Sequence, residues 1–162
     1  MEIYLTNELK EYYMKDFHEY VLASKHGFWA LDPGIRNYLI SINNSPVIQT
    51  LYSKKADPLK FGSYESYIEL AYFQHVELKI FREIIPTLLN EYNKMAESTL
   101  TCVFQQPQEN PNYGGEKQFG LGCIDNKDYF FINSVQIDFE SSNYDCHEKI
   151  WQDISFVFAA LK

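Results

Sequence analysis

The chain has little arginine, little cysteine and no long apolar run. Only Arg36 and Arg82 supply guanidinium groups, and the net charge is −8. An acidic chain of this kind is a poor candidate for binding nucleic-acid phosphates or an anionic membrane. No apolar stretch approaches the ~20 residues that a membrane helix needs. Cys102, Cys123 and Cys146 are widely spaced and odd in number, which is typical of free thiols in a reducing compartment.

The first residues also lack the features of an export signal. Glu2, Glu8 and Glu11 stand where a signal peptide has a basic start and an apolar run. Together with the cysteine pattern, this predicts a cytoplasmic protein. The length of 162 residues is typical of a single domain with a core of its own, covering residues 1–162.

Motifs that would identify a metal site or an enzyme are missing as well. Cys146 and His147 are adjacent, but neighbours on a helix point about 100° apart and do not form a ligand pair. There is no nucleophile elbow, and Gly120 and Gly122 fall in a predicted strand without a following helix, unlike a phosphate loop. We therefore predict no metal and no cofactor, and the sequence favours a protein that is not an enzyme.

Two acidic residues keep an enzymatic alternative open. Glu77 falls on the apolar face of a predicted long helix, and Asp16 lies on the rim of the first helix's apolar face. A buried carboxyl has a raised pKa and can act as an acid or base. The same positions also fit structural acids that bond a tyrosine hydroxyl or an arginine. The alternative is a small enzyme or small-molecule-binding domain that uses Glu77 or Asp16.

Apolar residues at helical spacing predict a helical N-terminal half. The expected helices cover residues 7–24 with Thr6 as N-cap, short segments after Asp32-Pro33 and Ser45-Pro46, residues 63–84 as a long helix that Pro86 ends or kinks, and residues 87–96. Residues 38–42 have a composition that is also typical of a strand, so a strand remains the alternative for this segment.

The hydrophobic period changes to two after residue 98. Strands are expected over residues 99–105, 119–125 and 129–140, and in the last of these Val135, Ile137 and Phe139 alternate with polar residues. A last helix begins near Ser142. The predicted fold is α+β, with N-terminal helices, a three-stranded antiparallel meander and a C-terminal helix packed on the sheet.

Acidic residues gather near the C-terminus. Between residues 125 and 153, seven acids oppose two lysines. If the last strand and helix are neighbours, their carboxylates form one patch that binds a protein partner, with Tyr144 or Tyr113 as an aromatic anchor. The predicted patch consists of Asp138, Glu140, Asp145 and Glu148. Acids at a helix start also complement the helix dipole, which is a purely structural explanation.

In general character the chain resembles bacterial toxin-immunity proteins. It is small, acidic, rich in tyrosine and phenylalanine, and without catalytic motifs. The resemblance lies in this character and not in a motif of one immunity family. It implies an inhibitor that neutralises a cognate toxin by stoichiometric binding in the cytoplasm. The expected partner is a basic toxin domain, with no nucleic acid and no membrane involved.

Overall fold

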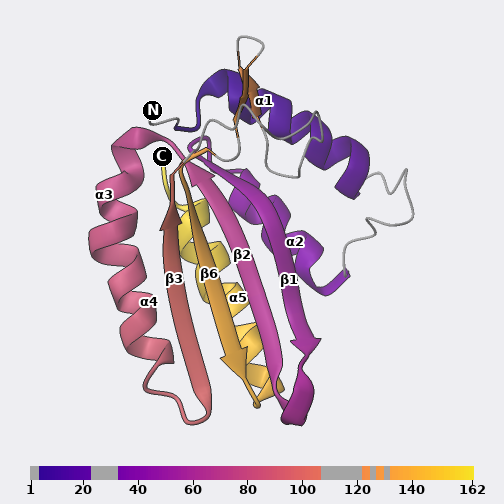
Figure 1. Ribbon diagram of the computed structural model, residues 1–162, viewed down its shortest axis with the longest axis vertical. Coiled ribbons are helices and arrows are strands. Elements are labelled where there is room, and N and C mark those ends of the chain that lie inside the picture. Colours follow the sequence, from indigo (N-terminus) through magenta and orange to yellow (C-terminus); the bar gives the residue numbers. More distant parts are fainter. Residues whose placement is uncertain (1–3, 23–32, 107–121, 125–126, 130–131) are drawn as a thin grey trace.

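The computed structural model describes residues 4–22, 33–106, 122–124, 127–129 and 132–162. These residues form an α+β fold around a four-stranded antiparallel sheet (Figure 1). The strand order is β1 (Ile48–Pro58), β2 (Tyr64–Tyr72), β6 (Ser134–Ser141) and β3 (Ser98–Gln105). A separate two-stranded sheet consists of β4 (Gly122–Ile124) and β5 (Lys127–Tyr129).

The predicted three-stranded meander is wrong in strand number and in strand order. β3 and the main part of the predicted last strand are present and pair with each other. β2 lies on the other side of β6, however, and joins it to β1. The predicted strand over residues 119–125 is described only as the short β4, and its remaining residues lie outside the described part of the chain. The sheet therefore combines two segments from each half of the sequence.

Both added strands come from segments that were predicted as helices. The long helix expected over residues 63–84 is β2 up to Tyr72, and only its end is helical. The short helix expected after Ser45-Pro46 is β1, which continues through Asp57 to Pro58. Asp57-Pro58 resembles a helix start because both residues are common there. At the end of an edge strand, a proline is tolerated for the separate reason that its missing N–H need not face a neighbour.

The remaining helical predictions agree better with the structure. α1 (Asn7–Asp16) begins at Thr6, whose hydroxyl accepts the Leu9 N–H at 3.2 Å. It passes into the π-helical segment η1 (Phe17–Leu22). α2 (Pro33–Asn43) settles the alternative at residues 38–42 in favour of a helix. Two single 3₁₀ turns, η3 (Lys60–Gly62) and η4 (Gln74–Val76), flank β2.

A continuous helical segment follows η4 and consists of three parts. These are α3 (Glu77–Lys79), the π-helical η5 (Ile80–Ile84) and α4 (Ile85–Tyr92). Pro86 lies in the first turn of α4 and does not end the helix, because a missing N–H costs least in a first turn. The last helix, α5 (Tyr144–Ala159), is capped by Asn143 and not by Ser142: the Asn143 side chain accepts the Asp145 N–H at 3.0 Å.

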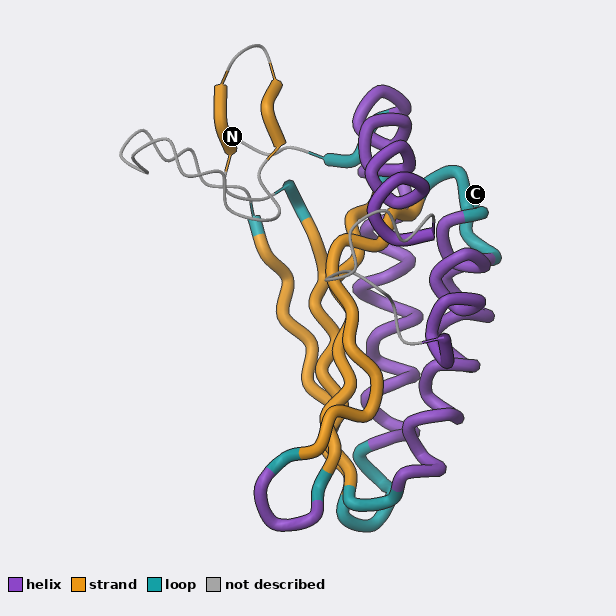
Figure 2. The backbone as a smooth tube through the Cα atoms, turned by 90° about the vertical axis from the view of Figure 1, so that its right-hand side faces the viewer, coloured by secondary structure: helices purple, strands orange, loops and turns teal. Residues whose placement is uncertain are grey.

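The sheet and the helices form two layers. α2, α4 and α5 lie along one face of the sheet, and Figure 2 shows strands and helices as separate layers. Val135, Ile137 and Phe139 point into the core between the layers, where α5 contributes Trp151, which stacks on Tyr38 of α2 with ring centroids 6.2 Å apart. The C-terminal helix thus packs on the sheet as predicted. In the described part of the chain, no helix is long and apolar enough to cross a membrane.

Candidate binding surface

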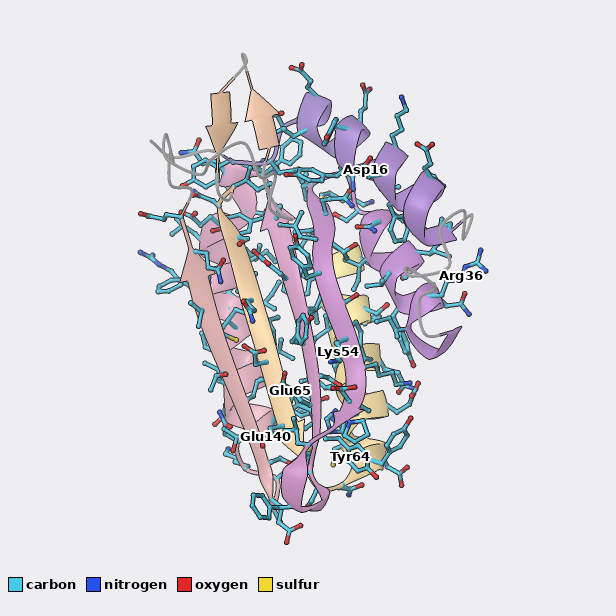
Figure 3. All side chains as sticks on the ribbon, turned by 45° about the vertical axis from the view of Figure 1, so that its right-hand side comes forward. Asp16, Arg36, Lys54, Tyr64, Glu65 and Glu140 are labelled. Atoms are coloured by element: carbon cyan, nitrogen blue, oxygen red, sulfur yellow. The ribbon has the colours of Figure 1, made fainter. Side chains whose placement is uncertain are left out.

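The side of the sheet turned away from α5 carries a cluster of acidic residues on its half nearest the β1–β2 turn. We call this half the open face; it consists of Lys54, Asp57, Glu65, Tyr67, Thr99, Thr101, Asp138 and Glu140. Figure 3 shows Lys54, Glu65 and Glu140 on this side of the sheet, with α5 behind it. Among the described residues, no helix covers the open face, and Thr99, Thr101 and Glu140 are exposed.

Strand register places three of these carboxylates together. Glu65 is directly opposite Glu140, and Tyr67 is directly opposite Asp138, on the neighbouring strands β2 and β6. Directly opposite side chains have Cβ atoms roughly 5 Å apart, and like charges at that spacing destabilise a sheet. Lys54, the one lysine of the open face, pairs with Asp57 at 2.7 Å. The fold therefore concentrates negative charge on the open face.

The other half of the same side of the sheet is covered. Leu5 and Leu9 of the α1 region pack there with Ala71 and Ile132 in a small second core. Glu69 is 5% exposed under this cover and accepts a hydrogen bond from the Ser134 hydroxyl at 2.8 Å. Burial raises the pKa of the Glu69 carboxyl above its ordinary value. Among the described residues, Glu69 is thus a buried acid with a raised pKa, and its low exposure leaves a substrate little access to the carboxyl.

The predicted patch is divided between two layers. Asp138 and Glu140 lie on the open face, whereas Asp145 and Glu148 belong to α5 on the opposite side of the sheet. Tyr144 is 52% exposed on α5, and its ring packs edge-on against Tyr64. Tyr113 lies outside the described residues. The structure thus brings together Asp138 with Glu140, and joins them with Glu65 of β2.

The Glu148 carboxylate is bound by two side chains of the same protein. Its carboxylate accepts hydrogen bonds from Lys55 of β1 and from the Tyr38 hydroxyl of α2. The Lys55 side chain is 7% exposed, so Glu148 neutralises a buried cation. The hydrogen bond from Lys55, followed by that from Tyr38, lowers the pKa of Glu148. These hydrogen bonds connect α5 to β1 and α2. Both oxygens of the Glu148 carboxylate therefore already have partners within the fold.

The two residues proposed for an enzymatic alternative do not form a catalytic pair. Glu77 begins α3 and accepts hydrogen bonds from the hydroxyls of Tyr4 at 3.2 Å and Tyr72 at 3.1 Å. It therefore has the tyrosine partners expected of a structural acid. Asp16 lies in the last turn of α1 on an exposed surface (Figure 3), and partial burial raises its pKa. The two acids belong to different elements and share no partner.

A serine–histidine pair is present, but it is closed to substrate. His147 Nδ1 lies 2.7 Å from the Ser66 hydroxyl, and Nε2 lies 3.2 Å from the Ser141 carbonyl oxygen. The carbonyl requires a proton on Nε2, so Nδ1 accepts from Ser66, whose oxygen in turn accepts the Ala56 N–H. His147 is 0% exposed and Ser66 is 3% exposed. The pair connects β1, β2, β6 and α5 within the core and has no access to a reactant.

The described residues were also compared with the requirements of a metal site and of a reactive cysteine. No group of three His, Cys, Asp or Glu side chains there is placed to hold a metal ion. Cys102 and Cys146 are free thiols, and burial raises the pKa of Cys102 to about 12. A thiol with so high a pKa is a poor nucleophile at neutral pH.

The turn between β1 and β2 presents a fully exposed aromatic residue. Phe61 is 102% exposed and has φ 71°, in the left-handed region that bulky residues rarely adopt. Gly62 follows with φ 77°, and the Leu59 N–H closes the turn on the Ser63 carbonyl at 2.8 Å. Strained, exposed residues of this kind are found at binding and switch sites. The turn lies at the same end of the sheet as Glu65 and Glu140.

No protein-family model matches the chain, and no curated protein or solved structure matches it either. The function is therefore inferred from the geometry of the open face and the Phe61 turn. Sequence reasoning missed Glu65 because residues 64–72 were read as a helix, in which Glu65 and Glu140 have no reason to meet. No local signal located it: the stretch Tyr64-Glu65-Ser66-Tyr67 places its two tyrosines three residues apart, which matches helical spacing and not the alternation of a strand.

Proposed function

We propose that the protein is an inhibitor that binds another protein through the open face, in the manner of an immunity protein that neutralises a basic toxin domain. The observation that carries this proposal is the meeting of Glu65, Glu140 and Asp138 on a sheet surface that no described helix covers. Two carboxylates held directly opposite each other repel, and a cationic partner relieves that repulsion.

Phe61 gives the same surface an aromatic anchor. Tight interfaces combine charged residues, which speed association, with a few desolvated aromatic side chains, which slow dissociation. Phe61 stands at the end of the open face with its whole ring in solvent. An inhibitor of a damaging enzyme needs both properties, since any free enzyme remains harmful.

Reversing the charge of the opposed pair should slow association with the partner. The partner is first identified by comparing proteins captured from the native cell by the wild type and by the variant Glu65→Lys/Glu140→Lys. We expect a basic protein that the wild type retains and the variant loses. With that partner, the association rate at low salt should fall by about tenfold or more and depend less on salt.

The matched control is Glu11→Lys/Glu83→Lys, which changes the same charge at exposed positions of α1 and η5. It should retain the partner and nearly the wild-type association rate. Equal capture and equal rates for both double variants would contradict the proposal, because the open face would then be an ordinary solvated surface.

Truncating Phe61 should affect dissociation and not association. Phe61→Ala is expected to weaken the complex by about 2 kcal/mol through a faster dissociation rate. The free protein should not lose stability, because the ring is fully exposed in the uncomplexed fold. Surface plasmon resonance measures both rates, and Phe156→Ala, at an exposed position of α5, is the control. An unchanged dissociation rate for Phe61→Ala would remove Phe61 from the interface.

A further inference from the structure

The helical segment formed by α3, η5 and α4 lies along the β3 edge of the sheet and carries two large apolar side chains in solvent (Figure 1). Ile80 and Ile85 of this segment are buried in the core between the layers. Leu78 and Phe81, by contrast, are 59% and 54% exposed. These two residues are three positions apart, so they are neighbours on the helix surface.

The apolar surface continues from the helical segment onto β3. The Phe81 ring packs edge-on against the ring of Phe104, with ring centroids 5.0 Å apart. Phe104 is itself only partly buried. We call Leu78, Phe81 and Phe104 the Phe81 patch. Single exposed apolar residues are ordinary on a protein surface, whereas a contiguous apolar patch is typical of an interaction site.

The charged residues beside the Phe81 patch are Lys79, Arg82 and Glu83. All three are exposed, and none has an ion-pair partner among the described residues. Lys79 and Glu83 are four positions apart and therefore share one flank of the helical segment. Phe81, midway between them in sequence, lies on the other flank, toward β3. A cation, an aromatic ring and an anion thus follow one another at equal spacing, and this order is self-complementary.

We propose that the Phe81 patch binds the Phe81 patch of a second copy, with the two helical segments antiparallel around a two-fold axis at Phe81. In a two-fold contact, residue i of one copy meets residue j of the other, and j meets i. With Phe81 at the axis, Lys79 of each copy faces Glu83 of its mate, because both are two positions from the centre. Arg82 extends toward the same Glu83 of the mate.

This self-association goes beyond the proposed function and does not depend on it, because the Phe81 patch and the open face consist of different residues. Charge complementarity favours a second copy as the occupant, since the chain itself supplies both members of each ion pair. Each copy also carries a net charge of −8, so we expect a reversible dimer and not a permanent one.

The test is sedimentation velocity of the full-length protein over a series of concentrations, in which the dimeric fraction of the wild type should rise. Lys79→Glu and Glu83→Lys should each raise the dimer dissociation constant by about tenfold or more, because each places like charges opposite each other twice per dimer. The swap variant Lys79→Glu/Glu83→Lys keeps the wild-type net charge and should dimerise more tightly than either single variant. A mixture of the two single variants, one of them fluorescently labelled, should form a mixed dimer in which positions 79 and 83 again face opposite charges.

Phe81→Ala should raise the dimer dissociation constant by about tenfold or more as well, through loss of the apolar contact at the axis. Phe156→Ala, at an exposed position of α5, is the matched control and should leave the dimer unchanged. A wild type that stays monomeric at every concentration overturns the proposal. A dimer that both single charge variants leave intact also overturns it, and so does a swap variant as weak as the single ones.

The double variant Glu11→Lys/Glu83→Lys separates the dimer from the proposed function. It should dimerise as poorly as Glu83→Lys and still retain the basic partner in the capture experiment. Loss of dimerisation with retained capture is the expected result, whereas a double variant that dimerises like the wild type would overturn the dimer and leave the proposed function intact. A foreign protein that a monomeric wild type captures and Phe81→Ala loses would assign the Phe81 patch to another occupant and overturn the second copy.

Discussion

Replacing Trp151 with alanine is expected to lower the free energy of unfolding by about 3–5 kcal/mol, the range for large aromatic side chains truncated in a core. Trp151 is 1% exposed in the middle of α5. Its ring stacks on Tyr38 of α2, and the same core includes Ile48 of β1 and Ile137 of β6. The substitution therefore opens a cavity where the helix layer meets the sheet. Urea denaturation followed by far-ultraviolet circular dichroism measures the loss without relying on tryptophan fluorescence.

Phe156 provides the control on the same helix. It is 79% exposed, five residues after Trp151. Phe156→Ala makes a similar change in side-chain size and helix propensity but removes almost no buried surface. Its effect should stay within about 0.5 kcal/mol, as for other surface substitutions. Comparable losses for the two variants would mean that Trp151 is not buried between α5 and the sheet.

Acidification below about pH 6.5, the ordinary pKa of histidine, is expected to destabilise the protein through His147. Burial lowers the pKa of His147, and the nearby Lys55 charge acts in the same direction, against a hydrogen bond to the Ser141 carbonyl. The His147 ring is therefore neutral in the folded protein. Below about pH 6.5 the same histidine takes up a proton in the unfolded chain but not in the folded protein. The stabilisation is complete above this pH and decreases below it, by at most about 1.4 kcal/mol per pH unit, until the folded pKa is reached.

Two variants isolate this effect. His147→Gln should cost about 1–3 kcal/mol at pH 7.5, because Ser66 and the Ser141 carbonyl lose well-placed partners. The cost should shrink as the pH falls to 5, since the variant cannot be charged at this position. His75→Gln, at an exposed position of η4, is the control for replacing a histidine outside the core and should cost within about 0.5 kcal/mol at pH 7.5. Glu69 and Glu148 titrate in every variant, so their contributions cancel in the differences. A cost for His147→Gln that is constant with pH would contradict a buried neutral histidine.

The C-terminal half of the fold could be predicted because its segments show one clear period. In β6, Val135, Ile137 and Phe139 are buried, while the residues between them are at least partly exposed up to Glu140. α5 places its apolar residues at helical spacing over four turns. Each of these two elements buries a single face. A single buried face places apolar residues at a regular spacing, which is two residues in a strand and about 3.6 in a helix.

β2 could not be recognised in this way, because its environment changes along its length. Near Glu65 only one of its faces is buried, whereas near Ala71 the α1 region covers the second face as well. The resulting run of Leu70, Ala71, Tyr72 and Phe73 lacks alternation and matches helical spacing with Tyr67. The second face of β2 is buried by the α1 region, which lies more than fifty residues earlier in the sequence. A local sequence pattern cannot predict a contact between such distant segments.

The binding surface was predicted in part for the same reason. Asp138 and Glu140 share a face because of the two-residue period of their own strand, so the sequence was sufficient for that pair. Glu65 joins them through a strand pairing 75 residues apart, between positions 65 and 140. Asp145 and Glu148 are near in sequence but follow the reversal at Ser141, which places them in the other layer. Proximity along the chain was therefore a poor guide to proximity on the surface.

The unequal edges of the sheet limit how far this molecule can polymerise. A chain with two pairing-competent edges can propagate from neighbour to neighbour into a fibre. Here β1 has register shifts between Thr50 and Tyr52 and between Lys54 and Asp57, which make its outer edge irregular. At the other edge, the Leu100 N–H of β3 donates to the Asn93 side chain at 2.7 Å, and the Leu100 carbonyl accepts from that side chain at 3.1 Å. Main-chain groups that another strand would need are therefore irregular at one edge and already bonded at the other, and growth of this sheet by strand addition is disfavoured at both.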